Sequence, residues 1–184
     1  MLRILSGSLK GQKILTPKDI RPATSTVRDA IFNIVSSQIE DANFLDLFSG
    51  SGAIGLEAIS RGAKFATFVD KSPVSVRFIK KNIKNLNLEA FAKVIPLDVN
   101  LALKRLPGIF DIVTIDPPFI IYEKNPLYIN NTLTYLITQN LIDKNSCIFL
   151  EEPTYSKRDP SIEGFFFKNK RKYGSCYLLE YFLK

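Results

Sequence analysis

Hydrophobic residues gather in short runs from Phe44 onward, and most runs are followed by a segment with helical spacing of its apolar positions. Near-continuous apolar runs are typical of strands with both faces covered, and helical spacing is typical of amphipathic helices. Their alternation predicts an α/β fold with a mostly parallel sheet and crossover helices. The predicted strands are residues 43–48, 65–70, 92–97, 110–115 and 146–151, and the predicted helices are residues 53–61, 73–86, 99–106 and 127–139.

The last part of the chain has a different pattern. Residues 164–173 and 175–183 are rich in aromatic and apolar side chains and flank Gly174, which predicts two strands joined by a tight turn. A C-terminal antiparallel hairpin on a mostly parallel sheet is not typical of a plain dinucleotide-binding domain. It is similar to the Rossmann-like sheet of class I methyltransferases, whose last strand is antiparallel.

Residues 1–43 are predicted to form an N-terminal extension, and residues 44–184 the main domain. Residues 2–5 and 12–15 are expected to pair as a short hairpin. A helix follows, with Thr24, Ser25 or Thr26 as its N-cap, and we expect it to pack on the sheet. The apolar positions that share one face of this helix are Val27, Ala30, Ile31, Ile34 and Val35.

The amino-acid composition limits which catalytic groups and metal ligands the protein can use. The 184 residues carry a net charge of +7, which favours a polyanionic partner, although many soluble proteins are basic without binding one. There is no histidine, which excludes histidine bases, Ser-His triads and histidine-ligated metals. Cys147 and Cys176 lack the paired spacing of metal ligands and are expected to be buried, inert thiols. We therefore expect no metal.

The sequence contains neither a secretory signal nor an apolar stretch that approaches the ~20 residues of a membrane helix. A cytoplasmic protein without membrane contact is expected on this basis. The sequence shows no oligomerisation signature, so a monomer is the default expectation.

A glycine-rich turn is the first candidate site. Gly50, Gly52 and Gly55 have the G-x-G-x-x-G spacing after an apolar strand and before a helix. Glycine permits the tight turn, the close approach of a ligand to the backbone and close packing of helix on strand. The sequence therefore predicts a nucleotide-like ligand here, and a purely structural turn is the alternative.

Three carboxylates indicate which ligand the turn would hold. Asp46 disfavours a pyrophosphate and would complement the positive charge of S-adenosylmethionine, unless it is only a turn or capping carboxylate. Asp70 ends the next strand, where a carboxylate can accept both ribose hydroxyls. Asp98 follows the third strand and could meet the adenine amino group, act as the N-cap of the next helix, or do both.

The second candidate site is Asp116-Pro117-Pro118-Phe119, directly after the strand 110–115. Ligands of open α/β sheets bind at this edge, so the loop is expected to face the glycine turn. The Asp116 carboxylate and the Pro117 carbonyl could orient an exocyclic base amine and make its lone pair available for methyl transfer. Phe119 offers a flat face on which an extruded base could stack. An ordinary proline-rich loop is the alternative.

The chain resembles the RsmD-type family of small-subunit ribosomal RNA guanine-N2 methyltransferases. The resemblance runs from the opening segment Arg3–Gly11 and the signature segment from Arg21-Pro22 through Asn33 to both candidate sites and the terminal Lys172-Tyr173-Gly174-Ser175. It implies that S-adenosylmethionine is the cofactor and that the substrate is one guanine of 16S ribosomal RNA within an assembled or assembling 30S subunit. The sequence departs from the family pattern at Ala23, where threonine is usual, and at Thr26, where a basic residue is usual.

Basic residues in two segments agree with an RNA substrate. They lie in the extension and at the final hairpin, where they could contact phosphates around a splayed loop, although such runs are often only solvated faces. The candidate RNA contacts are Arg3, Lys10, Arg21, Arg28, Lys170, Arg171 and Lys172.

Three alternatives remain open from the sequence. An amino-methyltransferase acting on DNA adenine or cytosine would use the same Asp-Pro-Pro-Phe chemistry, but the chain has little room for a segment that reads duplex DNA. A nicotinamide-dependent oxidoreductase would share the glycine turn, yet Asp46 and the terminal hairpin count against it. A non-catalytic RNA-binding assembly factor would not need the loop of residues 116–119.

Overall fold

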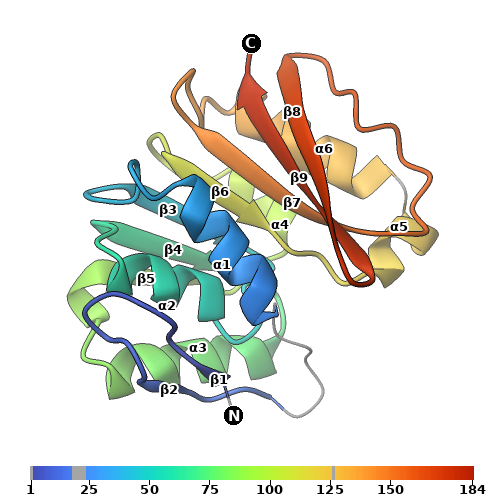
Figure 1. The fold of residues 1–184 in the computed structure, drawn as a ribbon. Helices are drawn as coiled ribbons and strands as arrows, with labels where there is room; N and C mark the ends of the chain where they lie inside the picture. Colours follow the sequence, from blue (N-terminus) through green and yellow to red (C-terminus); the bar gives the residue numbers. More distant parts are fainter. Residues whose placement is uncertain (1, 18–23, 126) are drawn as a thin grey trace.

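The central element is a seven-stranded sheet (Figure 1). The computed structural model describes residues 2–17, 24–125 and 127–184. The strand order is β5-β4-β3-β6-β7-β9-β8, with β5 to β7 parallel and with β9 antiparallel to both β7 and β8. This is the predicted class I methyltransferase arrangement, with its C-terminal hairpin. The strands are β3 (Asn43–Leu47), β4 (Phe65–Val69), β5 (Ala92–Ile95), β6 (Ile112–Ile115), β7 (Cys147–Pro153), β8 (Phe165–Tyr173) and β9 (Cys176–Leu183).

Helices cover both faces of the sheet. Because strand side chains alternate, Phe44 of β3 joins the core on one face and its neighbour Leu45 joins the core on the other. The first core is covered by α1, α2 and α3, and the second by α4 and α6. The helices are α1 (Ser25–Ile34), α2 (Ala53–Ser60), α3 (Pro73–Asn85), α4 (Val99–Leu103), α5 (Ile120–Lys124) and α6 (Leu127–Thr138), with a 3-10 turn at Glu89–Phe91.

The N-terminal extension contains the predicted hairpin in a shorter form. Its strands β1 (Leu2–Arg3) and β2 (Lys13–Ile14) pair antiparallel over two residues each. Helix α1 begins after Thr24, whose side chain accepts a hydrogen bond from Val27 N at 3.3 Å. Thr24 is therefore the N-cap among the three residues that the sequence left open.

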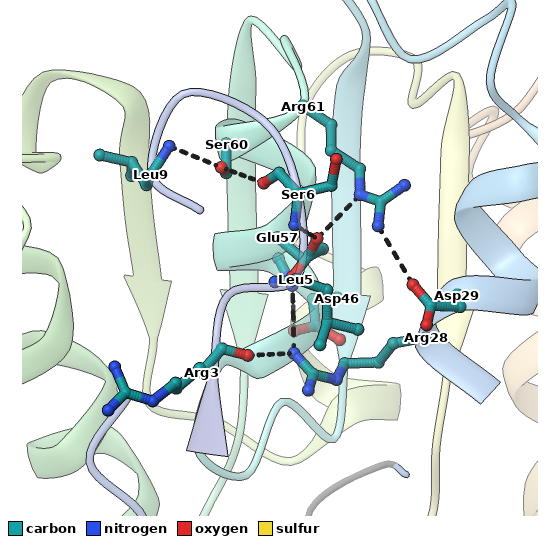
Figure 2. A network of polar contacts seen from close by, with 11 residues as sticks. Arg3, Leu5, Ser6, Leu9, Arg28, Asp29, Asp46, Glu57, Ser60 and Arg61 are labelled. Atoms are coloured by element: carbon teal, nitrogen blue, oxygen red, sulfur yellow. Dashed lines mark hydrogen bonds and ion pairs between the residues drawn. The ribbon is translucent and has the colours of Figure 1, made fainter. Parts of the chain in front are cut away.

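A buried charge cluster attaches the extension to α2 (Figure 2). The Glu57 carboxylate is fully buried and accepts hydrogen bonds from the backbone N–H groups of Leu5 at 2.7 Å and Ser6 at 2.9 Å. It also binds two cations, Arg61 at 2.8 Å and Arg28 at 3.5 Å. Since a buried charge is tolerated only when it is paired and hydrogen-bonded, these partners explain how Glu57 can lie inside the protein.

Gly55 of α2 packs directly against β4. A Cβ atom at this position would lie 2.4 Å from Cε1 of Phe68, a fully buried ring. We expect Gly55→Ala to lower the free energy of unfolding by about 1–3 kcal/mol because of this overpacking, despite the better helix propensity of alanine. Urea denaturation would measure the change, and a variant as stable as the parent protein would contradict the packing argument.

Both cysteines are buried, as predicted. Burial, reinforced by the charge of Glu180, raises the pKa of the Cys147 thiol to about 11. Within residues 2–17, 24–125 and 127–184, no group of three or more His, Cys, Asp or Glu side chains is placed to hold a metal ion. No helix in those ranges has both the length and the apolar character needed to cross a membrane.

Candidate active site

A cavity of about 560 Å³ lies at the carboxyl ends of the parallel strands. The glycine turn that follows β3 and the Asp116–Phe119 loop that follows β6 both line it. The predicted meeting of the two motifs at one edge of the sheet is therefore observed. Further lining comes from Thr24 at the start of α1, and from Tyr173, Ser175 and Cys176 around the β8–β9 turn.

The glycine turn is held by Asp70. One oxygen of the Asp70 carboxylate accepts the backbone N–H of Gly50 at 2.8 Å, and the other accepts that of Ser72 at 2.8 Å. Gly50 and Gly52 have positive φ angles of 56° and 78°, which the turn requires and which glycine adopts readily. Gly50 lines the cavity, whereas Gly55 supports the turn from behind through its contact with β4.

Asp46 lies at the floor of the cavity and is almost completely buried. Its carboxylate accepts the backbone N–H of Gly55 at 3.1 Å and the hydroxyl of Thr114 at 3.1 Å. Burial raises the pKa of Asp46 to about 7, although both hydrogen bonds oppose the shift. The carboxyl group therefore changes charge near neutral pH.

Asp98 is the N-cap of α4, which was one of its two predicted roles. Its carboxylate accepts the backbone N–H of Asn100 at 3.2 Å and the Tyr128 hydroxyl at 2.6 Å. Lys71 forms an ion pair with it at 3.3 Å. Asp98 also lines the cavity, so its position is compatible with the second role, an amino group as a further partner.

The loop after β6 is fixed by a short helix that the sequence analysis did not predict. The carbonyls of Pro118 and Phe119 accept backbone hydrogen bonds from the first turn of α5. The Tyr122 hydroxyl of α5 donates to the Glu151 carbonyl of β7 at 2.6 Å. These bonds attach the loop to the sheet, and Asp116, Pro117 and Phe119 all line the cavity.

The charge of the cavity differs from that of the chain. Five acidic residues line it, against one basic residue, Lys71, within the described part of the chain. The whole sequence, by contrast, carries +7. The buried Ser75 hydroxyl in the cavity wall has no hydrogen-bond partner among the described residues. The acidic lining residues are Asp46, Asp70, Asp98, Asp116 and Glu151.

One predicted RNA contact is corrected by the structure. Arg28 is only 1% exposed, because its side chain binds Glu57 and the Arg3 carbonyl inside the protein. It is thus a structural residue rather than a surface contact for phosphate. Arg3 and Lys10 are exposed, and Arg21 lies outside the described residues. The Arg3 guanidinium donates to the Gly11 carbonyl at 2.6 Å.

The basic run of β8 is partly engaged with β9. Lys170 lies over the Tyr177 ring at 4.2 Å, and Arg171 forms an ion pair with Glu180 at 3.3 Å. Lys170 and Lys172 are exposed. Because β8 ends at Tyr173 in the cavity wall, this run leads toward the mouth of the cavity.

Several lining residues were not found as site residues from the sequence. Thr24 and Ser175 belong to segments that reach the cavity only through tertiary packing. Tyr173 was part of the family resemblance, but no signal gave it a role. The other described lining residues outside the predicted set include Phe48, Ser49, Ser51, Lys71, Ser72, Ser75, Ile121 and Glu151.

The chain matches a known protein family over nearly its whole length. A family model described as "Conserved hypothetical protein 95" matches residues 2–182. The chain is 34% identical over 151 residues to ribosomal RNA small subunit methyltransferase D of Buchnera aphidicola subsp. Acyrthosiphon pisum (strain APS), covering 81% of this chain and 76% of that protein. It is 29% identical over 155 residues to the Haemophilus influenzae protein of the same name, covering 82% and 78%.

The fold is also similar to that of a solved relative. The structure of yhhF from Escherichia coli superposes with a TM-score of 0.86 at 29% identity, covering 100% of this chain and 98% of that one. Together, the matched family model, the relatives and the cavity at the strand ends show that this chain belongs to the Conserved hypothetical protein 95 family, the RsmD-type methyltransferases.

Proposed function

We propose that this protein transfers a methyl group from S-adenosylmethionine to the exocyclic N2 of a guanine in small-subunit ribosomal RNA. The observation that carries the proposal is an acidic cavity within a basic protein. Carboxylates favour a cationic cofactor, whereas the surrounding positive charge favours a polyanionic substrate. The names of the relatives, ribosomal RNA small subunit methyltransferase D, support the choice of RNA.

The residues of the cavity fit a cationic nucleoside cofactor. In this proposal Asp70 accepts the ribose hydroxyls and Asp98 accepts the adenine amino group, while Gly50 allows close approach of the ligand. Asp46 complements the positive charge from the cavity floor, and the Ser75 hydroxyl is available as a further partner. When bound, S-adenosylmethionine supplies a methyl group that is already activated by its sulfonium.

The reaction loop then needs to orient the nucleophile rather than to supply a strong base. The Asp116 carboxylate and the Pro117 carbonyl accept the two hydrogens of the guanine amine and direct its lone pair toward the methyl group. Phe119 provides the stacking surface for the base, as one wall of the cavity. Most of the rate enhancement thus comes from positioning.

Contacts outside the cavity are proposed to hold the RNA. Lys170 and Lys172 approach the cavity mouth along β8, and Arg3 and Lys10 are exposed in the extension. Arg171 would contribute less, because Glu180 already pairs with it. The proposed partner is the assembled or assembling small ribosomal subunit, with the protein acting as a cytoplasmic monomer without a metal.

Cofactor affinity should depend on pH through Asp46. Its pKa of about 7 lies above the ordinary 3.8, so the carboxyl group is largely protonated at pH 6 and ionised at pH 8. A cation in the cavity interacts favourably only with the ionised form. We therefore expect the Kd for S-adenosylmethionine to decrease as pH rises from about 6 to about 8. Calorimetry at each pH would measure this, and an unchanged pH profile in Asp46→Asn would contradict it.

The proposed function can be tested directly. Purified protein would be incubated with labelled S-adenosylmethionine and either small ribosomal subunits, naked small-subunit RNA or duplex DNA. The expected result is label on RNA only, found as N2-methylguanosine by mass spectrometry of the nucleosides. Label on DNA adenine or cytosine would instead support the DNA amino-methyltransferase alternative, and label on neither nucleic acid would contradict both.

A further inference from the structure

The loop after β7 passes beside the mouth of the cavity. Pro153 at the end of β7 pairs with Cys176, and the backbone N–H of Thr154 donates to the Ser175 carbonyl at 3.0 Å. Ser175 and Cys176 both line the cavity. Tyr155, the next residue along the loop, is therefore held close to the cavity wall.

Tyr155 also lies near the helix that follows the reaction loop. Partial desolvation and the neighbouring carboxylate of Glu123 in α5 raise the pKa of the Tyr155 hydroxyl, so this hydroxyl lies near α5. Ile120, one turn earlier in α5, lies on the same helical face as Glu123, since residues three apart are neighbours on a helix. Ile120 directly follows Phe119 of the cavity wall. Tyr155 thus lies near both α5 and the β8–β9 turn.

The Tyr155 side chain is not part of the hydrophobic core. Tyr155 is 54% exposed and Ile120 is 46% exposed, although both positions are close to the cavity. The exposed cations Lys124 and Lys157 and the exposed anions Glu123, Asp159 and Glu163 lie on the same two segments, so the surroundings of Tyr155 carry charges of both signs. An exposed aromatic ring beside the mouth of a cavity suits stacking on an unpaired nucleotide.

We propose that the Tyr155 ring stacks on the unpaired nucleotide next to the target guanine. This inference rests on the proposed function, because it takes the substrate to be a single-stranded RNA segment. A base that enters the cavity leaves its neighbour in the strand without a stacking partner. A ring just outside the mouth replaces that partner and fixes the strand, so Tyr155 is a positioning residue and takes no part in the chemistry.

The test compares three variants. Tyr155→Ala removes the ring, Tyr155→Phe keeps the ring but removes the hydroxyl, and Phe166→Ala removes an equally exposed aromatic (57%) near the opposite end of β8 from the cavity. The measurements are the Kd for a short fluorescent single-stranded RNA, kcat and KM for methyl transfer, and the Kd for S-adenosylhomocysteine.

Tyr155→Ala is expected to weaken RNA binding and raise the KM for RNA by about 5- to 150-fold, the range measured for loss of one stacked base. Its kcat and its affinity for S-adenosylhomocysteine should stay close to those of the parent protein. Tyr155→Phe and Phe166→Ala should behave like the parent, because the first retains the ring and the second is remote from the cavity.

Three results would overturn the inference. The first is an unchanged RNA Kd in Tyr155→Ala, and the second is a loss in Tyr155→Phe as large as that in Tyr155→Ala. The third is a loss seen only with assembled subunits and not with naked RNA, since this would mean that Tyr155 contacts a protein. If the parent protein methylates no RNA, the proposed function fails, while the RNA-binding measurement still decides the role of Tyr155.

Discussion

Asp116→Ala is expected to lower kcat for methyl transfer by about 10²- to 10³-fold, the range measured for removal of one hydrogen-bonding group that acts at a reacting centre. The Asp116 carboxylate lines the cavity at the end of β6, where the proposed mechanism needs an acceptor for an amine hydrogen. Affinity for S-adenosylhomocysteine should change little, because in the proposed mechanism the loop contacts the base and the glycine turn holds the cofactor.

Asp116→Asn is the matched variant for this prediction. Its amide oxygen can still accept one hydrogen bond, so we expect activity between that of the parent and that of Asp116→Ala. Calorimetry and single-turnover methylation of RNA would separate cofactor binding from catalysis. Full activity in Asp116→Ala, or a parallel loss of cofactor affinity, would mean that the reaction loop has been assigned wrongly.

Glu57→Ala is expected to lower the free energy of unfolding by about 3–5 kcal/mol, the usual consequence of leaving a buried charge without its partner. The substitution leaves the Arg28 guanidinium, which is 1% exposed, without an anion, and leaves the N–H groups of Leu5 and Ser6 without acceptors (Figure 2). For a domain of this size the melting temperature should fall by about 6–20 °C.

Asp29→Ala provides the control for this prediction. Asp29 pairs with Arg61 in the same cluster at 3.3 Å, but its side chain is 51% exposed, so the pair is worth about 1 kcal/mol or less. Thermal denaturation of both variants measures the contrast. A Glu57→Ala protein no less stable than Asp29→Ala would contradict the view that the buried carboxylate attaches the extension to α2.

The sheet could be predicted because its determinants are local in sequence. The apolar runs around Phe44 and Ile112 form strands close to the predicted bounds, and the run before Gly174 forms the hairpin. Helix α5 was missed because it has only five residues and follows two prolines, which leaves little periodicity to detect. Element boundaries differ by a few residues where capping decides them, as at the end of α4.

The motifs of the site could be predicted, but its walls could not. Asp70 and Asp116 were visible because each ends an apolar strand, and the parallel sheet brings such ends together. Arg28 was misjudged because its partner Glu57 lies far along the chain, and a sequence shows charge without showing burial. Thr24 and Ser175 reach the cavity by long-range packing, for which no local pattern exists.

The cavity wall includes Thr24 from the start of α1 and Cys176 from the start of β9, and 152 positions (176 − 24) separate them. A growing polypeptide therefore cannot complete the cavity wall until the β8–β9 hairpin has been synthesised and folded. An unfinished chain emerging from a ribosome therefore lacks part of the cavity wall.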